Sequence, residues 1–111
     1  NGKNHYPHDI QRTVEESHLA IGSASCAVFS VENTNSERVI VVAEIHHKQV
    51  SHRDELINTI RRVVSQEHAI SVSDIKLVLP GSIPKTTSGK IKHFLCKKNY
   101  LTKTLKEITL S

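Results

Sequence analysis

Two lysines with no carboxylate between them, Lys85 and Lys90, lie in a loop-like stretch toward the carboxy-terminal end of the chain. The stretch covers residues 79–96 and reads LPGSIPKTTSGKIKHFLC. Its prolines, glycines and hydroxyl residues are typical of an exposed loop rather than of a core. A cation on such a loop can reach a phosphate or carboxylate that the rest of the fold does not approach. These lysines are therefore the first candidates for chemistry.

The loop does not match a nucleotide-binding P-loop, which is the motif that a Gly-Lys pair first suggests. That motif, G-x-x-x-x-G-K-[ST], requires a glycine at position 84 and a hydroxyl residue at position 91 if Lys90 is its lysine. The chain has Pro84 and Ile91 at these positions. The magnesium-binding hydroxyl is therefore missing, and we exclude a P-loop.

The segment PKTTSGKI instead resembles the last motif of the acyl-adenylate-forming enzymes, which include acyl-CoA synthetases, peptide-synthetase adenylation domains, luciferases and fatty acyl-AMP ligases. The segment GKNHYPHDIQ, residues 2–11, resembles a second motif of this superfamily and is most similar to that of fatty acyl-AMP ligases. The two motifs follow the superfamily's order and span nearly the whole chain. The resemblance implies that residues 1–111 are a single carboxy-terminal lid subdomain of a larger ligase, without its amino-terminal domain.

The resemblance places the family's catalytic lysine on Lys90. In adenylate formation a carboxylate attacks the α-phosphate of ATP and pyrophosphate leaves, so a positioned ammonium stabilises the negative charge of the transition state. We expect Gly89 to let the backbone pass close to the substrate. Lys85 is expected either to bind phosphate or to solvate the loop, and the hydroxyl residues to form the turn. The predicted ATP-binding and substrate-binding loop comprises Lys85, Thr86, Thr87, Ser88 and Gly89.

The amino-terminal motif has a different implied role. In this superfamily the lid rotates between two poses, one presenting the lysine loop for adenylation and the other presenting this early motif for transfer. The alternative is an entry turn that only packs the first helix. By the resemblance, the acceptor route would be lined by Gly2, Asn4, His5, Tyr6 and Pro7.

The chain departs from the usual motifs at a few positions. Gln11 stands where Glu is commoner, and His8 where Gln is commoner. Lys92 and His93 stand where arginine-rich pairs are usual, and neither side chain offers the planar guanidinium that makes bidentate contacts.

The function implied for the full enzyme is ATP-dependent and Mg²⁺-dependent activation of a fatty acid, followed by transfer to the phosphopantetheine thiol of an acyl carrier protein. The alternative acceptor is CoA, as in an acyl-CoA synthetase. Seven lysines and no acidic residue lie between Lys85 and Lys106, a run that either forms a solvated face or complements an acidic carrier. The chain alone is expected to be inactive, because it offers no acyl pocket or nucleotide-binding core.

A small basic nucleic-acid-binding or interaction module is the alternative of another class. Its support is the net charge of +4. The four aromatic side chains, two Tyr and two Phe, are too few and too scattered for a base-stacking platform.

Composition predicts a cytoplasmic location and a small core of Val, Ile and Leu, since hydrophobic residues are 37% of the chain and no apolar run approaches a membrane span. Cys26 and Cys96 are expected to be buried free thiols. No metal site is expected, because the histidine clusters, His5 with His8 and His46 with His47, lack further ligands at zinc-site spacing.

Hydrophobic periodicity predicts helix, strand, strand, helix, strand and helix. This order predicts an α+β fold with a small, mostly antiparallel central sheet of about three strands and helices packed on it. The resemblance implies the same shape. The last helix is expected to pack through Ile91, Phe94, Leu95 and Leu101. The predicted ranges are 7–18, 26–31, 38–45, 51–68, 72–79 and 91–102.

Overall fold

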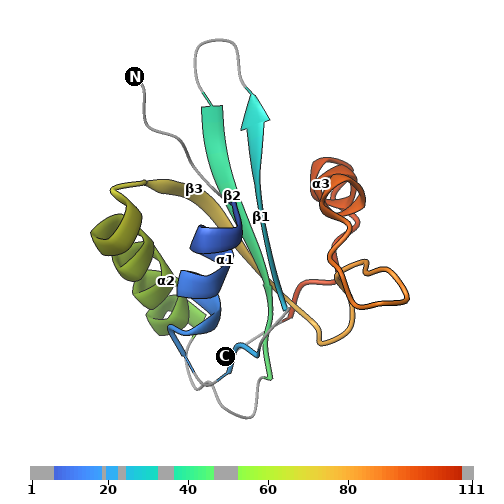
Figure 1. The fold of residues 1–111 in the computed structure, drawn as a ribbon, viewed down its shortest axis with the longest axis horizontal. Helices are drawn as coiled ribbons and strands as arrows, with labels where there is room; N and C mark the ends of the chain where they lie inside the picture. Colours follow the sequence, from blue (N-terminus) through green and yellow to red (C-terminus); the bar gives the residue numbers. More distant parts are fainter. Residues whose placement is uncertain (1–6, 19, 23–24, 33–36, 47–52, 109–111) are drawn as a thin grey trace.

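A computed structural model gives the fold of the chain (Figure 1) and describes residues 7–18, 20–22, 25–32, 37–46 and 53–108. The α+β class and the order of the elements are confirmed. Within these residues, three helices and three strands follow one another as α1 (Pro7–Glu15), β1 (Cys26–Glu32), β2 (Glu37–Glu44), α2 (Arg53–His68), β3 (Val72–Val78) and α3 (His93–Leu101).

The helices begin and end close to the predicted positions. Pro7 occupies the first turn of α1, where its missing N–H leaves no bond unmade. The helix ends at Glu15, before the predicted His18, and the Ser17 hydroxyl donates to the Val14 carbonyl at 2.6 Å, a local bond that competes with helix continuation. The predicted start of α2, Ser51, lies outside the described residues. No helix in the described part of the chain is long and apolar enough to cross a membrane.

The sheet has the order β1-β2-β3, with the apolar strand β2 at its centre as predicted. β1 is antiparallel to β2, whereas β2 is parallel to β3. The sheet is therefore evenly mixed where a mostly antiparallel one was predicted. The reason is α2, which carries the chain back along the sheet between β2 and β3, so that the two strands run in the same direction.

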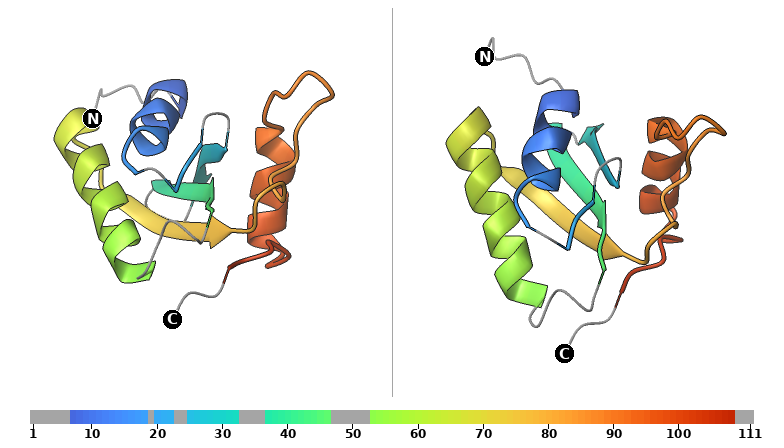
Figure 2. Two further views of the ribbon diagram at one scale, coloured as in Figure 1. Left: turned by 90° about the horizontal axis from the view of Figure 1, so that it is seen from below. Right: turned by 60° about the horizontal axis from the view of Figure 1, so that its bottom comes forward.

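Helices cover both faces of the sheet (Figures 1 and 2), with α1 and α2 on one face and α3 on the other. Alternate residues of β2 serve the two cores. Val41 and Ala43 pack with α1 and α2, while Ile40 and Val42 pack on the α3 side with Phe29 and Cys96. Because side chains alternate along a strand, Glu44 follows Val42 on the α3 side. This alternation directs a carboxylate toward the loop that precedes α3.

α3 packs differently from the prediction. Phe94 is 84% exposed, Leu95 38% and Leu101 53%, so the predicted apolar side of the helix faces outward. Ile91 lies before the helix and packs partly buried against the second core, as does Tyr100. The buried contacts come from Cys96 and Tyr100, which lie four apart on one side of the helix.

Tyr100 fixes the side that α3 presents to the sheet. Its ring meets Phe29 edge-on, with 5.7 Å between centroids, and its hydroxyl donates to Asp74 Oδ2 at 2.8 Å. Burial and the hydrogen bond to Asp74 raise the pKa of Tyr100. The side of α3 that faces the sheet therefore makes both an aromatic and a polar contact through Tyr100, while Phe94 faces outward.

Cys26 and Cys96 are free and buried, as predicted. Burial raises the pKa of Cys96 to about 11 and that of Cys26 well above its ordinary value. Neither thiol is a nucleophile near neutral pH, because the thiolate is the reactive form.

Candidate functional site

The predicted lysine loop is a small β-hairpin, which we call the lysine hairpin (residues 84–92). Its arms pair antiparallel at Lys85 and Ile91, and its turn spans residues 87–89. A type I turn followed by a left-handed glycine is a common three-residue hairpin connection. The backbone bonds that close the hairpin are Lys92 N to Pro84 O at 2.9 Å, Thr86 N to Lys90 O at 2.8 Å and Gly89 N to Thr86 O at 2.9 Å.

Gly89 is needed by the backbone of this turn. Its φ of +88° lies in the left-handed region, which L side chains rarely adopt. A Cβ atom built there would meet nothing within 4 Å, so no neighbouring protein atom requires the missing side chain. The expected close approach of Gly89 to a substrate stays a prediction.

The hydroxyl residues of the hairpin bond within the turn, as predicted for Thr86 and Ser88. Thr86 Oγ1 accepts from the Lys90 N–H at 3.1 Å and lies 3.1 Å from Ser88 Oγ. Thr87 is exposed at the turn. The side chain of Thr86 therefore holds the backbone of Lys90 in place before any ligand arrives.

Lys90 itself is exposed at the end of the turn. No ion pair to a described residue engages its ammonium. Its side chain borders an open cleft of about 550 Å³ between α1 and the hairpin. The other residues that line this cleft are His8, Gln11, Arg12, Glu15, Gly89, Ile91 and His93.

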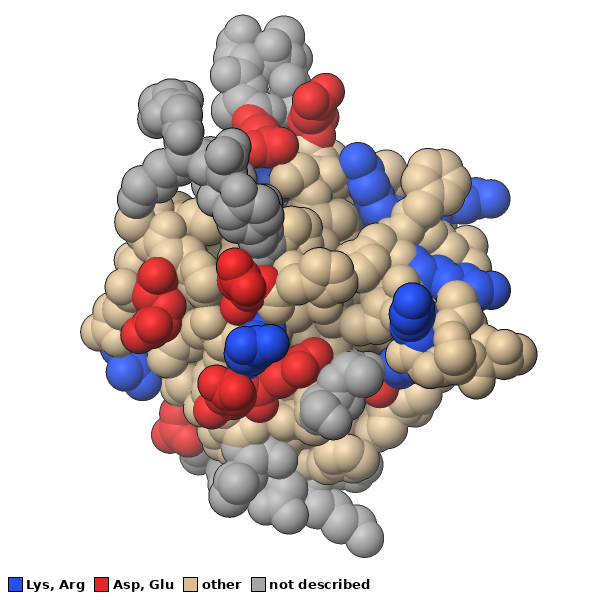
Figure 3. All heavy atoms as spheres, in the orientation of Figure 1, with Lys and Arg blue, Asp and Glu red and all other residues tan. Residues whose placement is uncertain are grey.

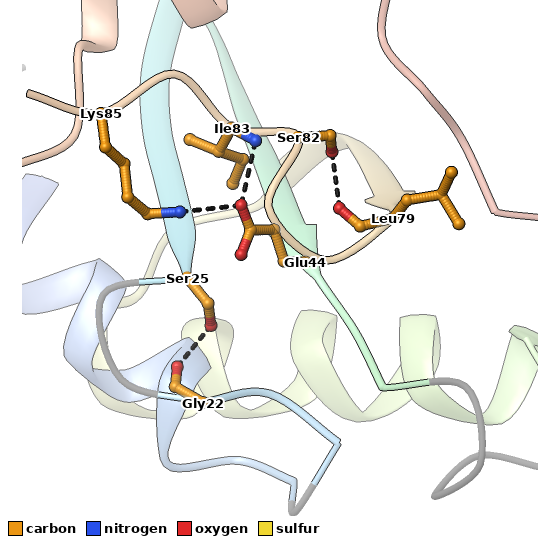
Figure 4. Close-up of polar contacts among 7 residues, drawn as sticks. All are labelled: Gly22, Ser25, Glu44, Leu79, Ser82, Ile83 and Lys85. Carbon is orange, nitrogen blue, oxygen red and sulfur yellow. Dashed lines mark hydrogen bonds and ion pairs between the residues drawn. The ribbon is translucent and has the colours of Figure 1, made fainter. Parts of the chain in front are cut away.

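Lys85 has a different environment. Its Nζ donates to Glu44 Oε2 at 2.8 Å, and the Ile83 N–H donates to the same oxygen at 2.9 Å (Figure 4). Glu44 is only 8% exposed. In this structure Lys85 anchors the entry arm of the hairpin to the end of β2. A role of Lys85 in phosphate binding stays a prediction.

Glu44 is the site residue that sequence reasoning missed. The available signal is a carboxylate that directly follows the apolar run 39–43, two residues beyond Val42 on the face that carries α3. A buried carboxylate requires a partner. That requirement indicates a cation brought in by another segment, but it does not identify the cation.

The chain turns toward the hairpin at Pro80 and Gly81. The Ser82 N–H donates to the Leu79 carbonyl at 3.1 Å, and Gly81 has a φ of +80°. Proline followed by a left-handed glycine is the pattern of a type II turn. The Ser82 hydroxyl adds a 2.6 Å bond to the same carbonyl, visible in Figure 4. The entry arm therefore leaves β3 through a turn of defined geometry.

Directly after the exit arm, the first residue of α3 meets α1 through the contact between His93 and Gln11. Gln11 is buried, and its Oε1 lies 2.6 Å from His93 Nε2 while accepting from the Val28 N–H at 3.3 Å. Because this oxygen is an acceptor, His93 donates through Nε2. The rings of His8 and His93 are edge-to-face at 6.3 Å. Burial and the nearby His8 lower the pKa of His93.

Of the predicted acceptor-side residues, Gly2, Asn4, His5 and Tyr6 lie outside the described residues. Pro7 begins α1 and borders a shallow groove of about 310 Å³ with His8, Val28, Phe29 and His93. The end of the amino-terminal motif and the start of α3 are therefore neighbours.

The lysines of the carboxy-terminal run form an exposed cationic face. In Figure 3, Lys and Arg gather at the right, over α3 and the hairpin, while Asp and Glu dominate the left and centre. Lys97 is partly buried. The exposed members of the face are Lys90, Lys92, Lys98, Lys103 and Lys106.

Metal ligands do not gather in the part of the chain that the structure describes, where no group of three or more His, Cys, Asp or Glu side chains could hold an ion. His5 and His47, members of the two histidine clusters, lie outside that part.

Comparison with known proteins shows which family the fold and the motifs match. A family model described as Disco-interacting protein 2-like, AMP domain, matches residues 1–110. The medium-chain-fatty-acid–[acyl-carrier-protein] ligase JamA of Moorena producens (strain JHB) is 42% identical over 106 residues, which are 94% of this chain and 18% of JamA.

Solved structures agree with this match. The fatty acid AMP ligase from Legionella pneumophila superimposes with a TM-score of 0.79 and 34% identity, over 97% of this chain and 19% of that one. The fatty acyl-adenylate ligase from L. pneumophila in complex with acyl adenylate and pyrophosphate has a TM-score of 0.72 and 32% identity, over 90% and 18%. The chain thus spans less than a fifth of each of these proteins.

Proposed function

Because the chain belongs to the family of Disco-interacting protein 2-like AMP domains, we propose that it is the carboxy-terminal lid of an ATP-dependent fatty acyl-AMP ligase and that Lys90 is its adenylation lysine. The observation that carries the proposal is the contrast between the two lysines of the hairpin. Lys85 forms an ion pair with Glu44, whereas Lys90 is exposed at the end of the hairpin turn and pairs with no described carboxylate. The matched family also favours this function over a nucleic-acid-binding module.

The chemistry assigned to Lys90 is charge stabilisation. A fatty-acid carboxylate oxygen forms a bond to the α-phosphorus of ATP, and the bond from that phosphorus to the bridging oxygen breaks as pyrophosphate leaves with the electron pair. Negative charge gathers on the oxygens around phosphorus, where an ammonium held by a preorganised turn is most effective. Mg²⁺ and the body of ATP would be held by the remainder of the ligase, since the lysine hairpin offers no carboxylate.

The acceptor that we propose is the phosphopantetheine thiol of an acyl carrier protein. The cationic face over α3 supports this choice, because carrier proteins are typically acidic and complementary charge speeds encounter. The similarity to JamA, whose name is that of an acyl-carrier-protein ligase, supports it as well. CoA is the alternative acceptor. Transfer would follow rotation of the lid, and we expect residues 1–111 alone to be inactive.

The test is fatty-acid-dependent ATP–pyrophosphate exchange by the full-length ligase that carries this domain. Lys90→Ala should slow exchange by roughly 10²–10³-fold, as for other single stabilising groups at a transition state. Transfer from preformed acyl-adenylate should suffer much less. Arg62→Ala, which removes an exposed cation of α2, is the control and should exchange normally. Exchange by Lys90→Ala at the control's rate would refute the proposal.

The acceptor is tested separately. Mutating Lys97, Lys98 and Lys103 to Glu should slow transfer to a carrier protein at low salt and leave pyrophosphate exchange unchanged. Unchanged transfer would remove the carrier-docking role from this face. Faster turnover with CoA than with any carrier protein would favour the acyl-CoA synthetase alternative.

A further inference from the structure

Gln11 and His93 are 82 residues apart in the chain and connect α1 to the first residue of α3, directly after the exit arm of the lysine hairpin. We propose that this hydrogen bond is a positioning contact for Lys90. Without it the hairpin would keep its internal bonds but lose its fixed placement beside α1. The proposal rests on the adenylation role of Lys90 given above.

The hydrogen bond between Gln11 and His93 lies beside the edge strand β1 and joins elements on opposite faces of the sheet. α1 and α3 occupy opposite faces of the sheet (Figures 1 and 2), so their backbones are separated by the sheet itself. Gln11 reaches past β1, where its Oε1 accepts from the Val28 N–H at 3.3 Å and lies 2.6 Å from His93 Nε2. One amide oxygen therefore ties together α1, the edge strand β1 and the first residue of α3.

The two arms of the hairpin are held to the rest of the fold by different contacts. Its entry arm is anchored at Glu44, through the Ile83 N–H and Lys85 Nζ. The exit arm leads into α3 through Lys92, whose side chain makes no capping hydrogen bond to the helix. On this arm Ile91 packs partly buried against the second core, and the side-chain hydrogen bond to another element that lies nearest to Lys90 is that of His93, three residues later. Loss of the bond to Gln11 would leave the hairpin with hydrogen bonds to the rest of the fold at its entry arm and, within the described residues, with only the packing of Ile91 at its exit arm.

A small displacement of the Lys90 ammonium would slow adenylation. A displacement of about 1 Å at a reacting centre can slow a reaction by about 10²-fold, even when the altered residue touches no substrate. Gln11 is only 8% exposed, so little of its side chain faces water although it borders the open cleft. A partly buried hydrogen bond of this kind restricts the arm more tightly than a fully exposed contact would.

The experiment uses the full-length ligase and compares Gln11→Ala, Gln11→Glu and His93→Ala in pyrophosphate exchange. Gln11→Ala should lower the adenylation kcat by about 10-fold with little change in KM, because the cation is misplaced in the transition state while substrate binding elsewhere is retained. Gln11→Glu keeps an oxygen acceptor for His93 and should restore most of the rate. The double variant Gln11→Ala/His93→Ala should be no slower than either single variant.

The matched control is Thr13→Val. Thr13 Oγ1 lies 2.7 Å from His68 Nε2, so this substitution removes a hydroxyl–imidazole bond that ties the same helix to α2, away from the hairpin. Thr13→Val should retain the wild-type kcat. The thermal unfolding temperature of each variant shows whether a lower kcat results from a smaller folded fraction. If Gln11→Glu restores kcat at the same unfolding temperature as Gln11→Ala, the bond acts by positioning Lys90.

The outcomes separate this inference from the proposed function. A normal rate for Lys90→Ala would refute the function and the positioning role together. If Lys90→Ala has a low exchange rate but Gln11→Ala exchanges as fast as the control Thr13→Val, the positioning role alone is overturned. The positioning role would also be overturned if the rate loss of the double variant equalled the product of the losses of Gln11→Ala and His93→Ala, because the two residues would then act independently.

Discussion

Glu44 and Lys85 are 41 residues apart in the chain, and the ammonium of one donates a 2.8 Å hydrogen bond to the carboxylate of the other (Figure 4). The same carboxylate oxygen accepts the Ile83 N–H at 2.9 Å. The Lys85 side chain is 25% exposed and that of Glu44 10%, so the pair lies at the margin of the second core. It joins the end of the central strand to the entry arm of the hairpin and distinguishes Lys85 from Lys90, which forms no ion pair with a described residue.

Glu44→Gln tests this anchor by removing the charge and keeping the shape. The amide can still accept from Ile83, but Lys85 loses its ionic partner in a partly buried position, so the free energy of unfolding should fall by roughly 1–3 kcal/mol. Urea unfolding measures the change. The control is Glu107→Gln, which removes the more exposed 3.6 Å pair with Lys76 and should cost less than about 0.5 kcal/mol. Equal losses would mean that Glu44 is no anchor.

The elements of this fold are predictable because their signals are local. The apolar run of β2 and the helical spacing of Leu56, Ile60 and Val64 each specify an element from neighbouring residues alone. The parallel pairing of β2 with β3 is not local, since it depends on the path that α2 takes between them. The face of α3 depends in turn on Tyr100 finding Asp74.

The site divides in the same way. The hairpin and its two lysines are predictable from a single stretch of small and basic residues. The contacts that hold the hairpin are not, because Glu44 with Lys85 and Gln11 with His93 join segments that only the folded topology brings together. Sequence reasoning noted Gln11 and His93 as separate departures from the usual motifs. The structure shows that the two positions are one contact.

Gly89 offers a test of why glycine stands in the turn. At a φ of +88° an alanine should cost roughly 1–2 kcal/mol, while asparagine, which visits the left-handed region more readily, should cost less. Urea unfolding of Gly89→Ala and Gly89→Asn gives this order if the backbone conformation is what matters. Pyrophosphate exchange by the full-length variants should follow the same order. Equally slow exchange by both variants would instead show that a substrate needs the space beside Gly89.

His93 should make stability depend on pH. Burial, and then the nearby His8, lower its pKa from the ordinary value of 6.5, so the unfolded chain takes up the proton at a higher pH than the folded one. The stability that His93 contributes is complete above its unfolded pKa and is lost as pH falls through the folded pKa. His93→Gln keeps an N–H donor toward Gln11 and cannot titrate. Wild type should therefore lose stability relative to His93→Gln between pH 7.5 and pH 5, measured by urea unfolding. A difference that is constant with pH would contradict this prediction.

Phe94 and Cys96 test the observed side of α3. Phe94 is 84% exposed and Cys96 is fully buried, although a hydrophobic ranking of the helix would bury the phenylalanine first. Phe94→Ser should change the free energy of unfolding by less than about 0.5 kcal/mol, because the side chain gives up little buried area. Cys96→Ser places a hydroxyl in the second core and should cost roughly 1–3 kcal/mol. Urea unfolding of the two variants measures both changes on one helix. A larger loss for Phe94→Ser than for Cys96→Ser would mean that α3 packs through its other side.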